Sequence, residues 1–410
     1  MGDSSVFVVL PNLYMAQKYY DQLLGFINDE YVLFFPADEL VSAEMIAATG
    51  DFLFERIQTI YSLLQGEKRI IVTNLHGLIK YEFPKSVWEY SVFSLRKGTC
   101  IEIKDLLDRL VKIGYEPVYT ITKTGEFSRR GSIVDVFPLG YDKPIRLDFF
   151  GDEIETIKYF NMDTQRSIEE IMSVNILPVT EFIYNDIEFK EAKRKLLNFL
   201  DSYKLSEIEE EMINKDLFSL ENHQNLLGLS RYFEFFNNDI STILSFTDKK
   251  RVYFIDPVKS KETYDHLLLD LNEYCGRMGG YLIANMKLFE SFERVQDSGN
   301  VFIEGLRTLG GLDYKLSIKE GTFYKGNQKE ILADFRRYRD NKYIILSYTN
   351  EERLNKLIDI CLDESLFLVR VKDSKDIKMG QINCIFGDYP SFNLIKDDIM
   401  FLNDASLYEV

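Results

Sequence analysis

The sequence predicts an α/β protein with a parallel-sheet domain, an inserted strand-rich module and a second, smaller α/β domain. Three observations predict this class. Over the first 80 residues, short apolar runs alternate with stretches of helical periodicity, which is typical of a parallel sheet with crossover helices. From about Trp88 extended segments follow one another closely. From about residue 315 strands and helices alternate again.

The first domain opens with apolar runs of strand length that are separated by helices. The second of these runs ends at Pro36. Asn12 lies just before the first helical stretch, and asparagine is a good N-terminal cap. We expect strands at Val6–Leu10, Tyr31–Phe35 and Arg69–Thr73, and helices at Asn12–Ile27 and Ser42–Gln65.

The middle of the chain predicts a compact antiparallel module near residues 90–178. An amphipathic helix comes first and is followed by Gly114, which suits the left-handed position after a helix. Several extended segments follow, and Phe150-Gly151-Asp152 has the composition of a hairpin turn. The expected helix is Ile101–Ile113, and the expected extended segments are Pro117–Thr122, Glu126–Ser128, Ser132–Phe137, Ile145–Phe150 and Glu153–Phe160.

The rest of the chain predicts helices at 188–240 and 258–295, with a strand at Arg251–Ile255 between them. A second α/β alternation follows, with strands at Tyr343–Ser347 and Leu366–Val371 around a helix at Glu351–Cys361. Four parts result: 1–89 and 179–314 form the parallel-sheet domain, 90–178 is the inserted module, and 315–410 is the small α/β domain.

Composition excludes several function classes. The formal net charge is −17, so the surface as a whole repels a phosphate backbone, and any nucleic-acid contact needs a local basic face. The four cysteines lie far apart without a CxxC pair, and the three histidines are scattered, so we expect no disulfide scaffold and no metal site. No apolar stretch approaches 18 residues and no leader is recognisable, so we expect a cytoplasmic protein without a membrane partner.

Motifs for catalysis or cofactor binding are absent from the sequence. No glycine is followed by lysine, so the phosphate-binding P-loop GxxxxGK[ST] has no match. Asp256 ends an apolar strand where a Walker B acid would lie, but Pro257 follows it, and we interpret Asp256 as a turn residue. The glycine-rich stretches at 276–280 and 310–311 are interpreted as turns. HExxH and GxSxG are also missing, so we expect no catalytic residue and no cofactor-binding residue.

One short stretch combines positive charge with an exposed aromatic residue. Residues 121–146 contain five cations and three acids in an otherwise acidic protein. Strand alternation in Ile145–Phe150 puts Arg146, Asp148 and Phe150 on the face opposite the core. An arginine beside an exposed aromatic is typical of a protein interface. The alternative is a surface pair between Arg146 and Asp148, with Phe150 covered by a loop.

Four short elements in this stretch resemble the domain shared by bacterial transcription-repair coupling factors and the excision-repair protein UvrB. That domain carries GEFxxRG, a D-hydrophobic-[FY]P turn, R-[LIV]-[DE]-FF and a closing QRS. Here these elements are Gly125-Glu126-Phe127 with Arg130-Gly131, Asp135-Val136-Phe137-Pro138, Arg146-Leu147-Asp148-Phe149-Phe150 and Gln165-Arg166-Ser167. The flanks are similar to the coupling factors, at Asn12-Leu13-Tyr14 with Ala16-Gln17, at Phe35-Pro36 with Asp38-Glu39-Leu40 and at Gly114-Tyr115-Glu116.

The resemblance to the coupling factors implies a degenerate P-loop, RecA-like parallel-sheet domain with an inserted α+β UvrA-binding module. It implies UvrA contacts at Arg130, Arg146 and Phe150, whereas Arg129 has no counterpart. It also implies that RNA polymerase and DNA are bound by domains outside this chain, that a C-terminal domain masks the UvrA surface, and that the full-length protein is an ATP-dependent DNA translocase. UvrB fits less well, because the segment between Phe34 and Gln65 leaves no room for its DNA-inserting hairpin.

Three functions remain as hypotheses from the sequence. The first is a non-catalytic platform that recruits UvrA to stalled RNA polymerase in transcription-coupled nucleotide excision repair. The second is a UvrB-like ATP-dependent helicase subunit with a divergent site, which ATP turnover would reveal. The third is a DNA-binding module that uses the same basic face, for which steep salt dependence of duplex binding would be expected.

Overall fold

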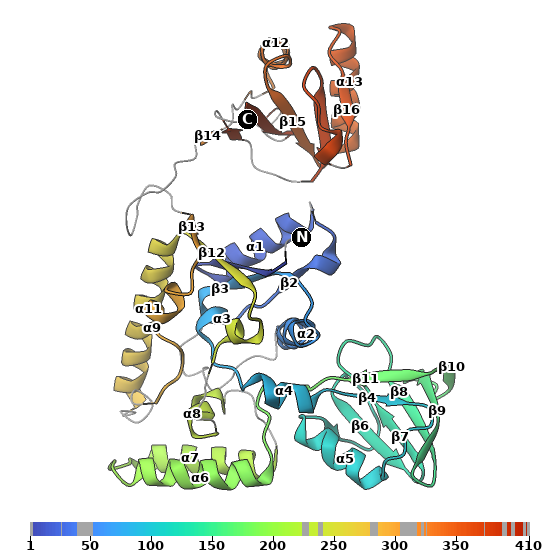
Figure 1. Cartoon of the computed structure of the whole chain (residues 1–410), viewed down its shortest axis with the longest axis vertical. Helices are drawn as coiled ribbons and strands as arrows, with labels where there is room; N and C mark the ends of the chain where they lie inside the picture. The colour runs from blue at the N-terminus through green and yellow to red at the C-terminus, as the bar shows by residue number, and fades with distance from the viewer. Residues whose placement is uncertain are drawn as a thin grey trace. The chain divides into compact units, whose positions relative to one another are not determined.

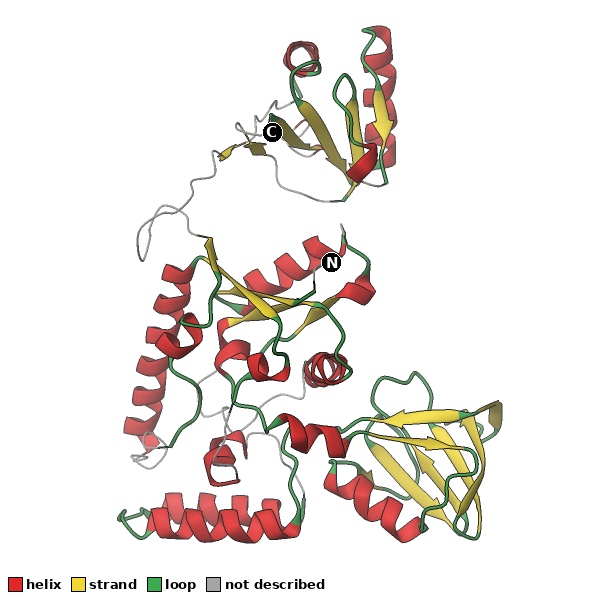
Figure 2. Ribbon diagram, viewed as in Figure 1, coloured by secondary structure: helices red, strands yellow, loops and turns green. Residues whose placement is uncertain are grey.

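The computed structural model of the chain forms two compact units, which are described one at a time (Figures 1 and 2). The first consists of Met1–Gln17 and Asp29–Arg307, and the second of Lys18–Asn28 and Thr308–Val410. The residues described are 3–25, 27–38, 52–223, 229–236, 241–278, 286–303, 318–320, 324, 326–372, 374–387, 392–394, 398–404 and 407.

A five-stranded sheet forms the centre of the first unit, and all of its strand pairs are parallel. The strand order is β13-β12-β1-β3-β2. The inner strands are apolar on both faces, as expected where helices cover both sides of a sheet. The α/β class predicted from the sequence is therefore confirmed. The strands are β1 (Ser5–Leu10), β2 (Val32–Phe34), β3 (Ile70–Asn74), β12 (Lys250–Ile255) and β13 (Val301–Ile303).

Most predicted helices of this unit are present. The Asn12 side chain accepts a hydrogen bond from the Met15 amide at 2.8 Å, so Asn12 caps the first helix as predicted. The interpretation of 276–280 as a turn was wrong for Gly276, which lies inside the last turns of α9, and residues 310–311 lie outside the described residues. The helices are α1 (Leu13–Leu24), α2 (Leu53–Leu64), α3 (Leu75–Ile79), α4 (Lys85–Ser91), α9 (Pro257–Met278) and α11 (Phe292–Gln296), with the 3-10 turn η1 (Asp29–Tyr31). Of α1, Leu13–Gln17 counts toward this unit and Lys18–Leu24 toward the second.

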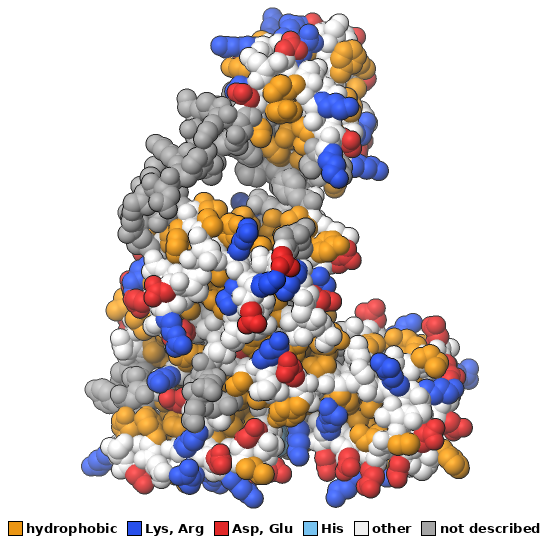
Figure 3. Space-filling view, viewed as in Figure 1, with side chains coloured by type: hydrophobic (Ala, Val, Ile, Leu, Met, Phe, Trp, Pro, Cys, Tyr) orange, Lys and Arg blue, Asp and Glu red, His pale blue; other side chains and the backbone are white. Residues whose placement is uncertain are grey.

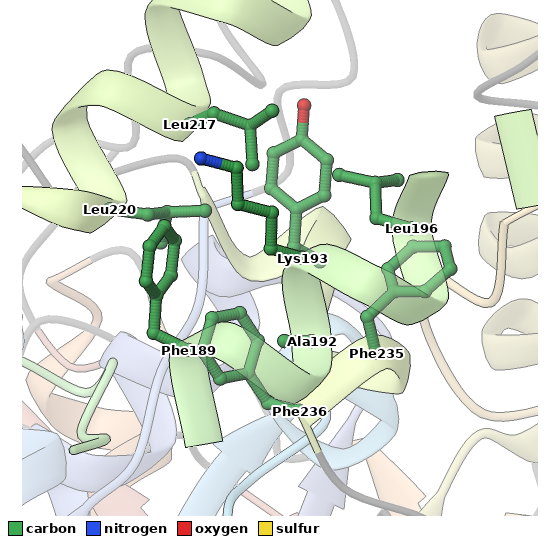
Figure 4. A pocket seen from close by; sticks show the side chains of 9 residues that line it. Phe189, Ala192, Lys193, Leu196, Leu217, Leu220, Phe235 and Phe236 are labelled. Atoms are coloured by element: carbon green, nitrogen blue, oxygen red, sulfur yellow. The ribbon is translucent and has the colours of Figure 1, made fainter. Parts of the chain in front are cut away.

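Along the chain, a group of helices follows the inserted module and precedes β12. Its two long helices each begin with a capping box, formed by Asn185 with Glu188 and by Ser206 with Glu209. Figure 4 shows the mainly apolar pocket that these two helices form with the shorter helical segments that follow them. It is lined by Phe189, Ala192, Lys193, Leu196, Leu217, Leu220, Tyr232, Phe235 and Phe236. The elements are α6 (Asp186–Leu200), α7 (Glu207–Glu221), η3 (Leu229–Tyr232), α8 (Phe233–Phe236) and η4 (Ile243–Phe246).

The inserted module is built on a six-stranded sheet of order β10-β9-β8-β7-β6-β5. One helix packs on it, and a separate strand pair, β4 with β11, joins its two ends. The expectation of a wholly antiparallel module was wrong at one edge, because β5 runs parallel to β6. The elements are β4 (Phe93–Arg96), α5 (Ile103–Lys112), β5 (Glu116–Pro117), β6 (Glu126–Arg130), β7 (Ile133–Val136), β8 (Ile145–Phe150), β9 (Glu153–Phe160), β10 (Ser167–Ile171) and β11 (Ser173–Ile176).

A largely buried group of four ionisable side chains lies where the chain returns from the module to the parallel sheet. Arg56 on α2 forms a two-bond ion pair with Glu181, with nitrogen–oxygen distances of 2.7 and 3.0 Å, and also donates to the Pro36 carbonyl at 3.1 Å. Lys80 contacts Glu181 at 3.3 Å and Glu82 at 2.7 Å. These contacts tie the exit of the module to α2 and to the segment after α3. We call Arg56, Lys80, Glu82 and Glu181 the junction cluster.

The junction cluster predicts a pH dependence of stability that is caused by Glu82. Burial, opposed by Lys80, raises the pKa of Glu82 to about 7. The neutral acid is thus favoured in the folded state. The stabilisation of the folded state by protonated Glu82 is complete below about pH 4.5 and is lost as the pH rises through about 7. We therefore expect Glu82→Gln to be more stable than wild type at pH 8, by roughly 2–3 kcal/mol, and nearly equal at pH 5.

Urea unfolding at both pH values measures this difference. Trp88, the single tryptophan, is fully buried in the same core and reports its unfolding by fluorescence. The control variant is Glu89→Gln, because Glu89 is about half exposed in its pair with Lys85. An equal or lower stability of Glu82→Gln at pH 8 would contradict the prediction. Glu181 does not contribute to the stability difference between pH 5 and pH 8. Burial alone would raise the pKa of Glu181, but Arg56 and Lys80 lower that pKa to about 2.

The second unit contains a six-stranded mixed sheet of order β14-β18-β19-β15-β17-β16. Its four strands from β19 to β16 are parallel, which confirms a second small α/β fold. The four-part division by residue number stays a prediction. Within the described ranges, no helix has both the length and the apolar composition that a bilayer crossing requires. The elements are β14 (Ile318–Glu320), α12 (Gln328–Tyr338), β15 (Tyr343–Tyr348), α13 (Glu351–Asp363), β16 (Leu368–Arg370), η5 (Ser374–Asp376), β17 (Ile382–Phe386), β18 (Phe392–Leu394) and β19 (Ile399–Asn403).

Candidate protein-interaction site

Strand β8 alternates between the core of the module and its outer face, as the sequence predicts. Ile145, Leu147 and Phe149 are buried in the core behind the sheet. On the outer face, exposure increases along the strand, from 15% for the Arg146 side chain to 29% for Asp148 and 80% for Phe150. The alternative in which a loop covers Phe150 is therefore wrong.

Cross-strand register puts all three predicted site residues on this outer face. Arg130 on β6 pairs with Ile133 on β7, which in turn pairs with Asp148 on β8. Directly paired residues in a sheet share a face, so Arg130 lies on the same side as Asp148. Phe150 is two residues beyond Asp148 and lies on that side as well. The fold thus brings the three residues, which come from β6 and β8, onto one face of the sheet.

Arg146 is not free on that surface. Its guanidinium forms two hydrogen bonds with Asp135 on β7, at 2.7 and 2.8 Å, and a third with the Gln165 carbonyl at 3.1 Å. The group also lies over the Phe160 ring, 4.6 Å from its centroid. The hydrogen bonds to Asp135 raise the pKa of Arg146. The expected alternative partner, Asp148, instead pairs with Lys158, so the Arg146–Asp148 surface pair is also wrong.

Arg130 and Phe150 form the accessible part of the site. Arg130 is exposed, and its guanidinium lies 5.8 Å from the ring centroid of Tyr119, with one nitrogen 3.4 Å from the Tyr119 carbonyl oxygen. Phe150 ends β8 at a two-residue turn in which Gly151 has a φ of +62°. Among the described large apolar side chains of the module, only Tyr119 is more exposed than Phe150. Tyr119 was missed by the sequence analysis.

The module matches the family model of the UvrB interaction domain over residues 93–182. Over nearly its whole length the chain is also similar to proteins described as transcription-repair coupling factors. The Bacillus subtilis protein is 27% identical over 98% of this chain, the Staphylococcus aureus strain Mu50 protein 25% over 100%, and a Staphylococcus epidermidis protein 25% over 98%. The chain as a whole is therefore similar to transcription-repair coupling factors, and its inserted module is similar to the UvrB interaction domain. It spans about 36% of the length of each of these relatives.

The motif elements of the UvrB interaction domain mainly hold its outer face together. The buried Glu126 carboxylate accepts hydrogen bonds from the amides of Thr122, at 2.6 Å, and Lys123, at 3.1 Å. Burial alone would raise the pKa of Glu126, but these bonds lower it. Asp135 and Gln165 hold Arg146, as described above. The motifs therefore mainly fix the scaffold of the UvrB interaction domain. The exposed motif residues are Arg130, Gly131, Phe150, Arg166 and Ser167, and Phe150 is the large apolar side chain among them.

The carboxyl ends of β1 and β12 lie at the edge where parallel α/β sheets commonly bind nucleotides. Between β1 and α1 lie only Pro11 and Asn12, and the Asn12 side chain already caps the helix. Asp256 follows β12 with a φ of 53°, and its carboxylate accepts a hydrogen bond from the Lys259 amide at 3.2 Å, as expected of a turn residue. Among the described residues, no group of three or more His, Cys, Asp or Glu side chains could hold a metal ion.

Proposed function

We propose that this chain is a protein-binding platform that recruits UvrA in transcription-coupled nucleotide excision repair. The observation that carries the proposal is the accessible surface formed by Arg130 and Phe150 within the matched UvrB interaction domain. Phe150 exposes 80% of its surface at the end of an ordered strand, although an aromatic ring of that size gains free energy when a partner removes it from water.

The three site residues have different roles in the proposed complex. Phe150 fills an apolar pocket on UvrA, and Arg130 forms a charge-assisted, two-bond contact with a carboxylate there. Arg146 is a positioning residue, because Asp135, Gln165 and the Phe160 ring already occupy its guanidinium. Arg146 keeps β7, β8 and the loop before β10 in register, so that Phe150 is presented in one orientation.

We propose that the platform does no chemistry itself. The short Pro11-Asn12 connection and the missing Gly-Lys dipeptide support this proposal, because a triphosphate needs a longer loop of backbone amides and a lysine. In the full-length protein, further domains bind RNA polymerase and DNA, and a C-terminal domain masks the UvrA surface at rest. On the face shown in Figure 3, described Lys and Arg side chains are interspersed with Asp and Glu side chains, a distribution that favours a protein partner over a phosphate backbone.

Calorimetric titration of this chain with purified UvrA tests the proposal. We expect wild type to bind. We expect Phe150→Ala and Arg130→Ala each to lose about 2 kcal/mol or more, which is a weakening of at least about 30-fold. The matched control is Met172→Ala, which removes a side chain of 70% exposure from another part of the same domain and is expected to bind like wild type. Binding by Phe150→Ala at wild-type strength, or no binding by folded wild type, would overturn the proposal.

A further inference from the structure

Tyr119 is the most exposed of the large apolar and aromatic side chains described, with 90% of its surface accessible. It belongs to the segment that leaves β5. The Val118 amide donates to the Phe127 carbonyl at 2.8 Å, so this segment continues alongside β6. Val118 and Ile121 on either side pack into a small cluster with Phe137 and Phe160. The backbone at Tyr119 is therefore held between two anchored neighbours while its ring extends into solvent.

The ring of Tyr119 adjoins Arg130, which is a residue of the proposed UvrA site. The Arg130 guanidinium lies 5.8 Å from the ring centroid, within the range of a cation–π contact. The same guanidinium lies 3.4 Å from the Tyr119 carbonyl oxygen. These two contacts restrict the rotamers of Arg130, while its remaining N–H groups stay available to a partner. Tyr119 therefore orients the arginine and adds apolar area directly beside it.

Strand order makes the proposed surface continuous. The sheet runs β5-β6-β7-β8, so Arg130 on β6 lies between the Tyr119 segment on one side and β7 with β8, which carry Ile133 and Phe150, on the other. At about 4.8 Å per strand, this row extends over about 15 Å, which is the scale of the central cluster of a standard protein interface. The chemistry is two aromatic rings on either side of the Arg130 cation, and the half-buried Ile133 and the ion pair of Asp148 with Lys158 lie between Arg130 and Phe150.

We propose that Tyr119 is a contact residue of the surface that binds UvrA, an inference that rests on the proposed function. The complementary surface on UvrA then presents a carboxylate for Arg130, flanked by two apolar contact points, one for Phe150 and one for the Tyr119 ring. Tyrosine suits this role because it gives a large contact area at low conformational entropy cost. The formal net charge of the chain is −17, so most of its surface repels an acidic partner. The Arg130 cation therefore marks this surface for a partner that carries a local acidic site.

Titration of UvrA with a set of variants tests the inference. We expect Tyr119→Ala to weaken binding about 10-fold and Tyr119→Phe to stay within about 3-fold of wild type, because the ring supplies the contact. Removal of a side chain of 90% exposure is not expected to change the thermal unfolding midpoint. In the double variant Tyr119→Ala/Arg130→Ala, the loss is expected to be smaller than the product of the two single losses, because the two side chains act together.

The outcomes separate this inference from the proposed function. If Phe150→Ala loses binding while Tyr119→Ala binds like the Met172→Ala control, the role of Tyr119 is refuted and UvrA recruitment stands. If Tyr119→Ala and Phe150→Ala both weaken binding, both are supported. If folded wild type does not bind UvrA at all, the proposed function fails and the inference fails with it.

Discussion

Replacing Arg56 by alanine is expected to lower the free energy of unfolding of the first unit by about 3–5 kcal/mol. The Glu181 carboxylate would then keep Lys80 as a partner but lose both bonds to Arg56, which are 2.7 and 3.0 Å long. Both members of the pair are strongly buried, with side-chain exposures of 7% and 13%, so water cannot replace the lost charge. The Pro36 carbonyl would lose a donor as well.

Urea unfolding followed by Trp88 fluorescence measures this effect, because Trp88 lies in the same core. The control is Arg69→Ala, which breaks a partly exposed pair with Glu67 and is expected to cost only about 0–1 kcal/mol. A double variant Arg56→Met/Glu181→Leu removes both charges together and is expected to recover most of the stability, since paired apolar replacements of buried ion pairs are often neutral. A cost below about 1 kcal/mol for Arg56→Ala would refute the role of the junction cluster.

Replacing Asp135 by alanine is expected to destabilise the UvrB interaction domain by about 3–5 kcal/mol and to weaken UvrA binding as much as Arg146→Ala does. The Asp135 side chain is only 3% exposed and holds two nitrogens of Arg146, so its loss leaves a mostly buried guanidinium without its charge partner. Phe150→Ala, in contrast, is expected to lose binding without loss of stability, because its ring packs on little.

Hydrogen exchange of the β7 and β8 amides, together with UvrA titration, shows whether Arg146 positions the site or contacts UvrA directly. The control is Asp148→Ala, which breaks a pair with Lys158 in which both side chains are nearly 30% exposed, and we expect a cost of about 0–1 kcal/mol. If Asp135→Ala loses both amide protection and UvrA binding, as Arg146→Ala does, then Arg146 acts by positioning Phe150. If Asp135→Ala binds UvrA normally while Arg146→Ala does not, Arg146 contacts the partner directly.

The elements of the fold could be predicted where the local pattern determines them. The period of two in β8 separates core from surface within six residues, and the exposure of Phe150 followed from that alternation. The cap at Asn12 and the left-handed Gly114 after α5 were also predictable, because each depends on neighbours along the chain. The resemblance then added residue roles that no pattern in a single sequence supplies.

The partners of charged side chains could not be predicted in the same way. Arg146 pairs across the sheet with Asp135 and not with Asp148 on its own strand, and the register between β7 and β8 is not visible in either strand alone. The junction cluster is formed by residues up to 125 positions apart, and each of its charges taken alone is typical of a solvated surface. Tyr119 lies in a segment without periodicity, so nothing in the sequence indicated that its ring is exposed beside Arg130.

The antiparallel pairing of β4 with β11 has a consequence for the origin and folding of the insertion. Phe93 and Ile176 pair directly, so the two ends of a long insertion meet within one strand spacing. Such an insertion requires only that two points of the host chain lie one strand spacing apart, so the order of the host's own strands does not change. A short turn that joins Phe93 directly to Ile176 is therefore expected to leave the parallel sheet able to assemble, as long as Glu181 stays in the chain as the partner of Arg56.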